Sequence, residues 1–343
     1  MKKVYVYPDR SYSPVGDVNP YRSDMVEAFR ANGCTVIKSK TAWLGTIDFI
    51  FRFWQIDILV GNWLEEVANR KHGYIQSLAL LVSIPLLKVF GVKIVWIVHN
   101  KKSHNLKNEV FTDFFRNFLF RKADLIIAHS KDGLSDFGDC ASKISYFPHP
   151  FKRNKYNSIF KNYRYDILIW GKIQPYKGIL EFLQFLKENH FEKKYSINIQ
   201  GQCPNKEYFN RLYKFSSDEI KIHDSYIDDS ELEAIISNSR VILFTHKQDT
   251  VLSSGALIES LRYGKTVFGP NIGNFRDLYL SDDIVKVYDS FHQLIQHLDN
   301  LFDNKLEYTS VEKIESVSSQ YSWELFIKYI LDSLNISYVK DKL

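Results

Sequence analysis

The sequence predicts an α/β protein made of two doubly wound domains, and three observations lead to that prediction. Its 343 residues exceed the ~100–200 residues typical of one domain. Hydrophobic residues make up 45% of the chain and aromatic residues 15%, which suits a folded protein with large cores. Short β-branched or aromatic runs also alternate with amphipathic helical patterns, as in parallel sheets covered by helices on both faces.

Two series of strand–helix units follow one another along the chain. A basic, Asn- and Tyr-rich stretch at 151–165 separates them, so we predict an N-terminal domain at 1–150 and a C-terminal domain at 151–321. The segment 322–334 is a further amphipathic helix. The expected strands are 2–8, 56–62, 93–100, 123–130 and 144–150 in the first series, and 165–171, 195–201, 219–225, 240–246 and 266–270 in the second.

Charge and cysteine content narrow the classes of function. The formal net charge of +5 favours anionic small molecules or an anionic membrane surface, and the basic residues are too scattered for a nucleic-acid-binding protein. The three cysteines lack paired spacing, so neither a disulfide framework nor a zinc site is expected. The most apolar segment, 77–98, is interrupted by Pro85, Lys88 and Gly91 and divides into a helix and a strand. We therefore expect a cytoplasmic protein.

A strand-to-helix turn at the beginning of the second domain carries two lysines. The segment WGKIQPYKGILEFLQFL ends a strand at Gly171, places Lys172 and Lys177 in the turn and enters a helix at Gly178. Two mobile positive charges on one strand-tip loop suit a diphosphate. Lysines on surface loops also commonly face water, so this pair alone leaves a solvated loop as an open alternative.

A later segment, SSGALIESLRYGKTVFGP, places small residues where a helix begins. Ser253, Ser254 and Gly255 follow an apolar strand and a polar loop, so their backbone N–H groups and the positive end of the helix dipole suit a phosphate. Glu259, one turn further, would accept hydrogen bonds from a ribose diol beside a diphosphate. An ordinary Ser N-cap with an exposed Glu259 is the alternative. The lysine loop favours the site, because both elements would meet one diphosphate.

The first domain offers weaker signals. The loop after its first strand contains Gly16 and Asn19 but no GxGxxG, and the chain has no P-loop, which argues against a dinucleotide enzyme and an ATPase. His99 ends a predicted strand, where side chains face a ligand site, although a lone histidine is more often structural. No pair of histidines has metal-ligand spacing, so we expect no metal. Asp228 and Glu231 are better explained as a helix N-cap and its reciprocal glutamate.

Together these segments resemble the GT-B glycosyltransferases, most closely the large retaining family, glycosyl transferases group 1, that contains many bacterial capsule and lipopolysaccharide sugar transferases. The matching segments occur in family order across nearly the whole chain. They are VHN (98–100), ADLIIAHS (123–130), FPHP (147–150), WGKIQPYKG (170–178), IQGQ (199–202), YIDDSELEAIISNSRVILFTH (226–246) and SSGALIESLRYGKTV (253–267).

The resemblance implies a GT-B fold, in which two Rossmann-like domains face a central cleft and a final helical segment (322–343) packs back on the first. It implies an enzyme that moves a sugar from a nucleotide-diphosphate sugar to a hydroxyl of a saccharide or lipid-linked saccharide in cell-surface polysaccharide synthesis. The donor would be UDP- or GDP-linked, the transfer retaining, and neither a metal nor another cofactor is expected.

The resemblance also implies roles for particular residues. His99 would approach the donor sugar, Lys172 and Lys177 would stabilise the leaving diphosphate, and Glu259 would hold the ribose. The expected catalytic residues are therefore His99, Lys172 and Lys177; the donor-binding residues are Gly171, Lys172, Lys177, Ser253, Ser254, Gly255, Ala256 and Glu259; and the acceptor-side residues are Gly16, Asp17 and Asn19.

Two positions depart from the family pattern. Val251 stands eight residues before the predicted ribose-binding glutamate, where the family often has another glutamate, and Asp249 is acidic but offset. Lys172 replaces the usual arginine, which keeps the charge and loses the fork of donors. The stereochemical outcome therefore stays open, because an inverting enzyme would need a carboxylate base in the first domain, such as Asp17 or Asp24.

Other functions and locations also stay open. A nucleotide-sugar epimerase can share this architecture but needs paired acid/base carboxylates, and a non-catalytic nucleotide- or sugar-binding protein would need none. Helix 75–87 is strongly apolar, and 111–124 mixes aromatic with basic residues, which permits peripheral contact with the anionic inner face of the cell membrane. Burial in the core of the first domain explains the same segments, and it is the explanation that we expect.

Overall fold

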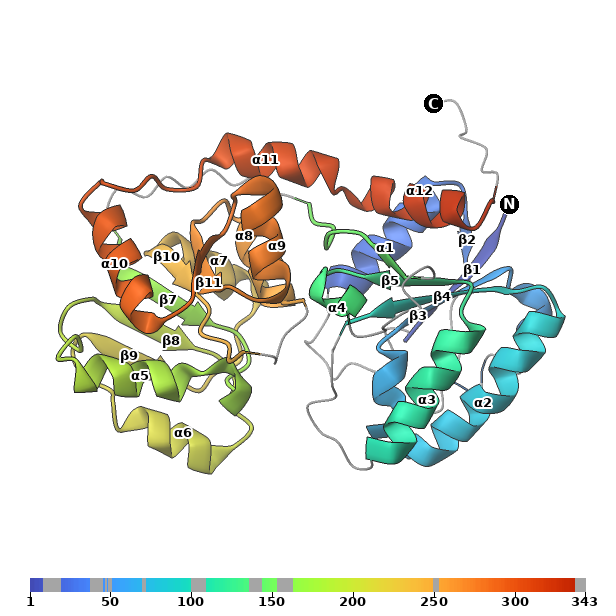
Figure 1. Cartoon of the computed structure of the whole chain (residues 1–343), viewed down its shortest axis with the longest axis horizontal. Helices are drawn as coiled ribbons and strands as arrows, with labels where there is room; N and C mark the ends of the chain where they lie inside the picture. Colours follow the sequence, from blue (N-terminus) through green and yellow to red (C-terminus); the bar gives the residue numbers. More distant parts are fainter. Residues whose placement is uncertain are drawn as a thin grey trace. The chain divides into compact units, whose positions relative to one another are not determined.

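The chain folds into two compact α/β units in the computed structural model (Figure 1). The first unit contains residues 1–150 and 321–343, and the second contains residues 151–320. The structure describes residues 1–8, 20–37, 46, 48, 51–69, 72–99, 109–135, 144–152, 163–248 and 253–336. Five residues discussed above, Gly16, Asp17, Asn19, Asp249 and Val251, lie outside the described residues.

Six parallel strands form the sheet of the first unit, in the order β2–β1–β3–β4–β5–β6. The strands β3 and β4 are almost continuously apolar because helices cover both faces of the sheet. The strands are β1 (Lys3–Tyr7), β2 (Thr35–Val36), β3 (Ile58–Asn62), β4 (Lys93–Val98), β5 (Leu125–Ala128) and β6 (Ile144–Tyr146). The last strand is shorter than the predicted 144–150, since the prolines that follow it have no N–H for a ladder.

Two pairs of helices cover this sheet. Figure 1 shows α1 (Pro20–Ala31) and α12 (Trp323–Ser333) on one face, and α2 (Gly73–Val89) and α3 (Glu109–Lys122) on the other. The final helix α12 completes the core of the first unit, where its buried Phe326 and Ile330 join Met25 and Phe29 of α1. The shorter elements are η2 (Phe53–Gln55), η3 (Leu64–Asn69) and α4 (Asp132–Ser135).

The predicted burial of helix 75–87 is wrong for its outer face. Ile75, Leu78 and Val82 of α2 are 55%, 58% and 64% exposed. No described element of the first unit covers this face, because α2 packs its other side against η3, α3 and β4. None of the helices in the described part of the chain is both long and apolar enough to cross a membrane.

The second unit is a six-stranded parallel sheet in the order β12–β11–β10–β7–β8–β9. After β9 the chain returns to the other side of β7, so the strand order reverses between β7 and β10. Open α/β sheets bind ligands outside the carboxyl ends of their strands at such a reversal. The strands are β7 (Tyr165–Trp170), β8 (Ile197–Gln200), β9 (Ile220–His223), β10 (Ser239–Leu243), β11 (Val267–Pro270) and β12 (Lys286–Tyr288).

Helices cover both faces of the second sheet. Figure 1 shows α5 and α6 on one side and α8 and α9 on the other. The helices are α5 (Ile179–Glu188), α6 (Lys206–Tyr213), α7 (Asp229–Ser237), α8 (Gly255–Arg262), α9 (Gly273–Asp282), α10 (Phe291–Phe302) and α11 (Val311–Gln320), with η5 (Pro175–Lys177) before α5.

The start of α7 confirms half of the predicted capping box. Asp228 Oδ1 accepts a hydrogen bond from the Glu231 amide at 2.8 Å, as an N-cap does. The carboxylate of Glu231 does not return to the cap. It accepts a hydrogen bond from Gln200 Nε2 at the end of β8 instead. The reciprocal half of the prediction is therefore wrong, because a tertiary partner takes the glutamate.

The core position of α12 predicts a unit-specific loss of stability. Phe326→Ala should lower the free energy of unfolding of the first unit by about 3–5 kcal/mol, because its buried ring fills the core. All tryptophans except Trp170 lie in the first unit, so tryptophan fluorescence in a Trp170→Phe background measures this unit alone. Leu325→Ala, at a 44% exposed neighbour, is the control. Equal losses in the two variants would contradict the prediction.

Candidate functional site

The end of β7 brings three of the predicted residues together. Gly171 has a φ of +95°, and a Cβ placed on it would lie 3.3 Å from Lys177 Nζ and 3.9 Å from Ala256 Cβ. The absent side chain therefore leaves room for the Lys177 amino group beside the first turn of α8. Trp170 Nε1 donates a hydrogen bond to Ser260 Oγ at 2.9 Å, which ties the end of β7 to the same helix.

The loop that carries Lys177 packs closely on the end of β10. Thr245 Oγ1 donates a hydrogen bond to the Lys177 carbonyl oxygen at 2.6 Å. Gly178 follows with a φ of +67°, and a Cβ on it would lie 2.2 Å from the Thr245 carbonyl oxygen. Only glycine fits this approach, so Gly178 and Thr245 together determine where the lysine backbone lies.

The Lys177 ammonium group is buried without a compensating carboxylate. Its side chain is only 9% exposed, and burial followed by the positive charge of Lys172 lowers its pKa to about 8. No described carboxylate forms an ion pair with Lys177. Lys172 is exposed, as expected of a loop lysine that faces water. A bound anion would stabilise the charged form of Lys177, because it would replace the lost hydration.

The start of α8 offers amide groups beside this charge. Ser254 is the N-cap, and its Oγ accepts a hydrogen bond from the Leu257 amide at 3.3 Å. The Ser254 amide donates to Asn274 Oδ1 at 3.1 Å, and Asn274 Nδ2 donates to Ser253 Oγ at 3.4 Å. Ser254 N–H is thus engaged within the protein. No described residue accepts from the Gly255 amide, and a Cβ on Gly255 would meet nothing within 4 Å.

Glu259 lies one turn into α8 and is not the exposed side chain of the N-cap alternative. Its side chain is 20% exposed, and its Oε2 lies 3.1 Å from Arg262 Nη1. The ion pair with Arg262 holds the carboxylate against α8. The second unit therefore groups its predicted residues at the carboxyl ends of β7 and β10, where the strand order reverses.

A cavity of about 280 Å³ adjoins this group through Gly178. The Glu181–Lys247 ion pair, at 2.6 Å, borders it together with Tyr288 and Phe291. None of the predicted donor-binding residues lines this cavity. The predicted donor-binding residues therefore lie beside this cavity, around Gly171, Lys177 and the start of α8.

In the first unit, His99 lies at the end of β4 in a buried cluster. Its ring stacks on Trp63 with centroids 4.1 Å apart, and its Nε2 lies 3.2 Å from Asn62 Oδ1. Asn62 Nδ2 donates to the Tyr7 carbonyl oxygen at 3.1 Å, which turns Oδ1 toward the histidine. His99 Nε2 therefore carries the hydrogen, and its Nδ1 is the acceptor.

Two more histidines at strand ends surround Tyr21 of α1. Tyr21 Oη lies 2.7 Å from His129 Nε2, and His129 Nδ1 lies 2.8 Å from the Phe147 carbonyl oxygen. The tyrosine hydroxyl therefore donates to Nε2, and Nδ1–H donates to the carbonyl. His149 Nδ1 donates to the Pro150 carbonyl oxygen at 2.9 Å. These contacts join the ends of β5 and β6 to α1.

Burial keeps the three histidines neutral. It lowers the pKa of His129 to about 3 and that of His149 to about 4, and it holds the pKa of His99 well below its usual value. The neighbouring histidines lower the pKa values of His99 and His129 further. Among the described residues, no three His, Cys, Asp or Glu side chains are grouped as metal ligands.

Sequence reasoning missed Asn274 and Tyr21. Asn274 is the buried second residue of α9, and only the fold brings it to Ser254. Tyr21 lies on α1 and meets histidines more than a hundred residues away. The one available signal for the cluster around Tyr21 was that His99, His129 and His149 lie near the ends of successive strands.

The fold is shared with solved glycosyltransferase structures. HepE from Anabaena in complex with UDP aligns with a TM-score of 0.65 at 14% identity, covering 98% of this chain and 100% of that one. A glycosyltransferase from Rickettsia africae ESF-5 has a TM-score of 0.66 at 12% identity, with 98% and 100% covered. Sucrose-phosphate synthase from Thermosynechococcus elongatus has a TM-score of 0.69 at 12% identity, with 97% and 99% covered.

These likenesses confirm the predicted GT-B fold, with two parallel sheets flanked by helices. A crystal structure of HepE in complex with UDP-glucose has also been solved. No family model matches the sequence, and no curated protein matches it.

The buried histidines predict acid sensitivity in the first unit. Their folded pKa values lie below the unfolded value near 6.5, so the unfolded chain binds more protons as the pH falls below about 6.5. The free energy of unfolding should therefore decrease from pH 7 to pH 5, measured by urea denaturation and tryptophan fluorescence in the Trp170→Phe background.

His129→Gln is the matched variant for this measurement. Its amide can accept from the Tyr21 hydroxyl and donate to the Phe147 carbonyl oxygen, but it does not titrate. The decrease between pH 7 and pH 5 should be smaller in this variant. Parallel pH profiles for the variant and the wild type would contradict the role of His129.

Proposed function

We propose that the protein is a glycosyltransferase that moves a sugar from a nucleotide-diphosphate sugar to a hydroxyl of a saccharide or lipid-linked saccharide. The observation that carries the proposal is the buried Lys177 ammonium, which has no described carboxylate partner and lies beside the first turn of α8. The structures of HepE with UDP and UDP-glucose support a donor of this class, UDP- or GDP-linked, on the same fold.

Charge explains how these residues would act. Cleavage of the sugar–phosphate bond places negative charge on the leaving diphosphate and positive character on the sugar. Lys177, Lys172 and the positive end of the α8 dipole would stabilise the diphosphate as that charge grows. Gly255 and Ala256 would donate their amides, and Glu259 would accept from the ribose hydroxyls. Following the resemblance, the proposal includes a retaining outcome. It includes neither a metal nor a further cofactor.

The first unit contributes the remaining residues of the proposal. The neutral ring of His99 has an acceptor at Nδ1, which suits a sugar hydroxyl better than a phosphate. Gly16, Asp17 and Asn19 stay the predicted acceptor side. The biological setting of the proposal is the synthesis of a bacterial capsule or lipopolysaccharide in the cytoplasm. A lipid-linked acceptor would require peripheral contact with the inner face of the cell membrane.

Incubation with a panel of UDP- and GDP-sugars tests the proposal against its alternatives. A transferase without acceptor should hydrolyse one donor slowly, because water replaces the acceptor hydroxyl. Interconversion of two nucleotide sugars would instead identify an epimerase, and tight binding without turnover a binding protein. Lys177→Met should abolish whichever turnover is observed if the leaving diphosphate needs its charge.

Glu259→Ala should weaken the binding of UDP or GDP, whichever the wild type binds. Loss of charge-assisted hydrogen bonds to the ribose should lower the affinity by roughly tenfold to a hundredfold, measured by isothermal titration calorimetry. Arg262→Ala separates the effect of the lost ion pair, because it breaks the same contact and keeps the carboxylate. Unchanged affinity in Glu259→Ala would remove the ribose assignment.

The affinity for the nucleoside diphosphate should fall as the pH rises above about 8. The free protein loses the Lys177 charge above its pKa of about 8, while a bound diphosphate raises that pKa and so needs proton uptake. The terminal phosphate loses its last proton between about pH 6 and pH 7, so it is ionised above pH 8, where the decline is expected. Calorimetry between pH 7 and pH 9.5 would measure the decline, and Lys177→Met should bind weakly with little pH dependence. A flat wild-type profile would exclude Lys177 from the diphosphate site.

A further inference from the structure

The inner side of helix α2 buries Leu80, Ile84 and Leu87 together with three polar side chains, and its outer side is apolar. Gln76, Ser77 and Ser83 are buried against the first unit. Ile75, Leu78, Val82 and Val89 form the opposite stripe at the helical spacing and are between 55% and 81% exposed. A helix on the surface of a water-soluble domain normally has polar side chains on its exposed side. The outer stripe of α2 is therefore built for an apolar environment.

Aromatic side chains extend this stripe at both ends of the helix. At the carboxyl end, Phe90 packs on Phe53 of η2 with ring centroids 4.2 Å apart, and Trp54 beside it is 63% exposed. At the amino end, Tyr74 packs on Phe111 of α3 with centroids 5.3 Å apart, and Phe114 follows on the same helix. We call the stripe and its two aromatic ends the α2 surface. Such rings suit the boundary between water and lipid.

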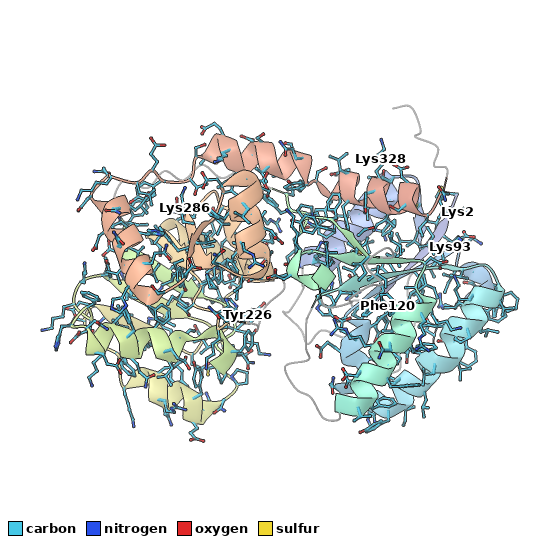
Figure 2. All side chains as sticks on the ribbon, in the orientation of Figure 1. Lys2, Lys93, Phe120, Tyr226, Lys286 and Lys328 are labelled. Atoms are coloured by element: carbon cyan, nitrogen blue, oxygen red, sulfur yellow. The ribbon has the colours of Figure 1, made fainter. Side chains whose placement is uncertain are left out.

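Basic and acidic residues both border the α2 surface, and basic residues are in excess over the first 150 residues of the chain. Glu66 lies on η3 and Asp113 on α3, two of the elements that pack against α2. Lys88 and Lys93 follow the stripe at its carboxyl end, where Asp124 pairs with Lys88 at 2.5 Å; Figure 2 labels Lys93. Residues 1–150 contain 20 lysines and arginines against 14 acidic residues, whereas residues 151–343 contain 25 against 26. The basic excess therefore belongs to the part of the chain that has the apolar stripe.

We propose that the α2 surface docks on an anionic lipid bilayer, with α2 lying in the plane of the interface. A helix of 17 residues is about 25 Å long, and it would insert one apolar side while its basic neighbours meet lipid phosphates. A second copy of the chain fits less well, because a symmetric contact would bring together two N-terminal units that each have an excess of basic residues. This inference stands on the surface alone and holds whether or not the protein transfers sugar.

Vesicle co-sedimentation tests the proposal with the full-length protein. The wild type should bind vesicles of phosphatidylcholine containing about 30 mol% phosphatidylglycerol at low salt, and bind pure phosphatidylcholine much less. Leu78→Gln/Val82→Gln should weaken binding to the anionic vesicles at least tenfold, since the contact with lipid loses two apolar side chains. Leu280→Gln, at a 68% exposed leucine of α9 in the second unit, is the matched control and should bind like the wild type.

Three results would overturn the proposal. They are equal wild-type binding to neutral and anionic vesicles, unchanged binding in the double variant, and a wild-type dimer in solution that becomes monomeric in the double variant while vesicles bind neither. The variants should unfold thermally at the wild-type temperature, because both side chains face outward. UDP and GDP affinities, measured in parallel, report on the second unit, so the failure of vesicle binding is distinguishable from a failure of the proposed function.

Discussion

The amino group of Lys177 is the feature on which the second unit depends. Burial removes much of the hydration of this charge, and no described carboxylate replaces it. The surroundings hold the lysine there regardless: Gly171 leaves space for the amino group, and Gly178 lets the loop approach Thr245. Such an arrangement is unfavourable for an empty domain and favourable for one that receives an anion, because the anion supplies the missing partner.

The first unit, in contrast, provides hydrogen-bond acceptors for its buried histidines within the protein. His129 and His149 satisfy their Nδ1 hydrogens with backbone carbonyl oxygens, and His99 satisfies its Nε2 hydrogen with Asn62. Burial then favours neutral rings, whose remaining nitrogen atoms are acceptors. Strand ends with neutral imidazoles suit hydroxyl groups, whereas strand ends with a buried ammonium suit phosphates. The two units thus differ in the chemistry that their strand ends can serve, although both are parallel sheets of six strands.

Local patterns predicted what depends on neighbours in the chain. The alternation of apolar strands and helices predicted both sheets, Asp228 was predicted as a helix cap, and Gly171 and Gly178 marked the turn of the lysine loop. A Ser N-cap at the start of α8 was the alternative to a phosphate site, and Ser254 is that cap. Contacts between distant segments were beyond reach. Asn274 holds the Ser254 amide and Gln200 takes the Glu231 carboxylate, and nothing at those positions in the sequence indicates the partner.

Helix α2 shows why a pattern that is apolar all round is ambiguous. Its composition predicts burial equally well in a protein core or at a lipid interface, since both remove the side chains from water. The position of the polar residues decides between them only once the inner side of the helix is known. Because Ser77 and Ser83 face the protein, Leu78 and Val82 are left to face outward. Polar side chains would suit this face if it met only water. The four positions of the stripe, Ile75, Leu78, Val82 and Val89, are all apolar.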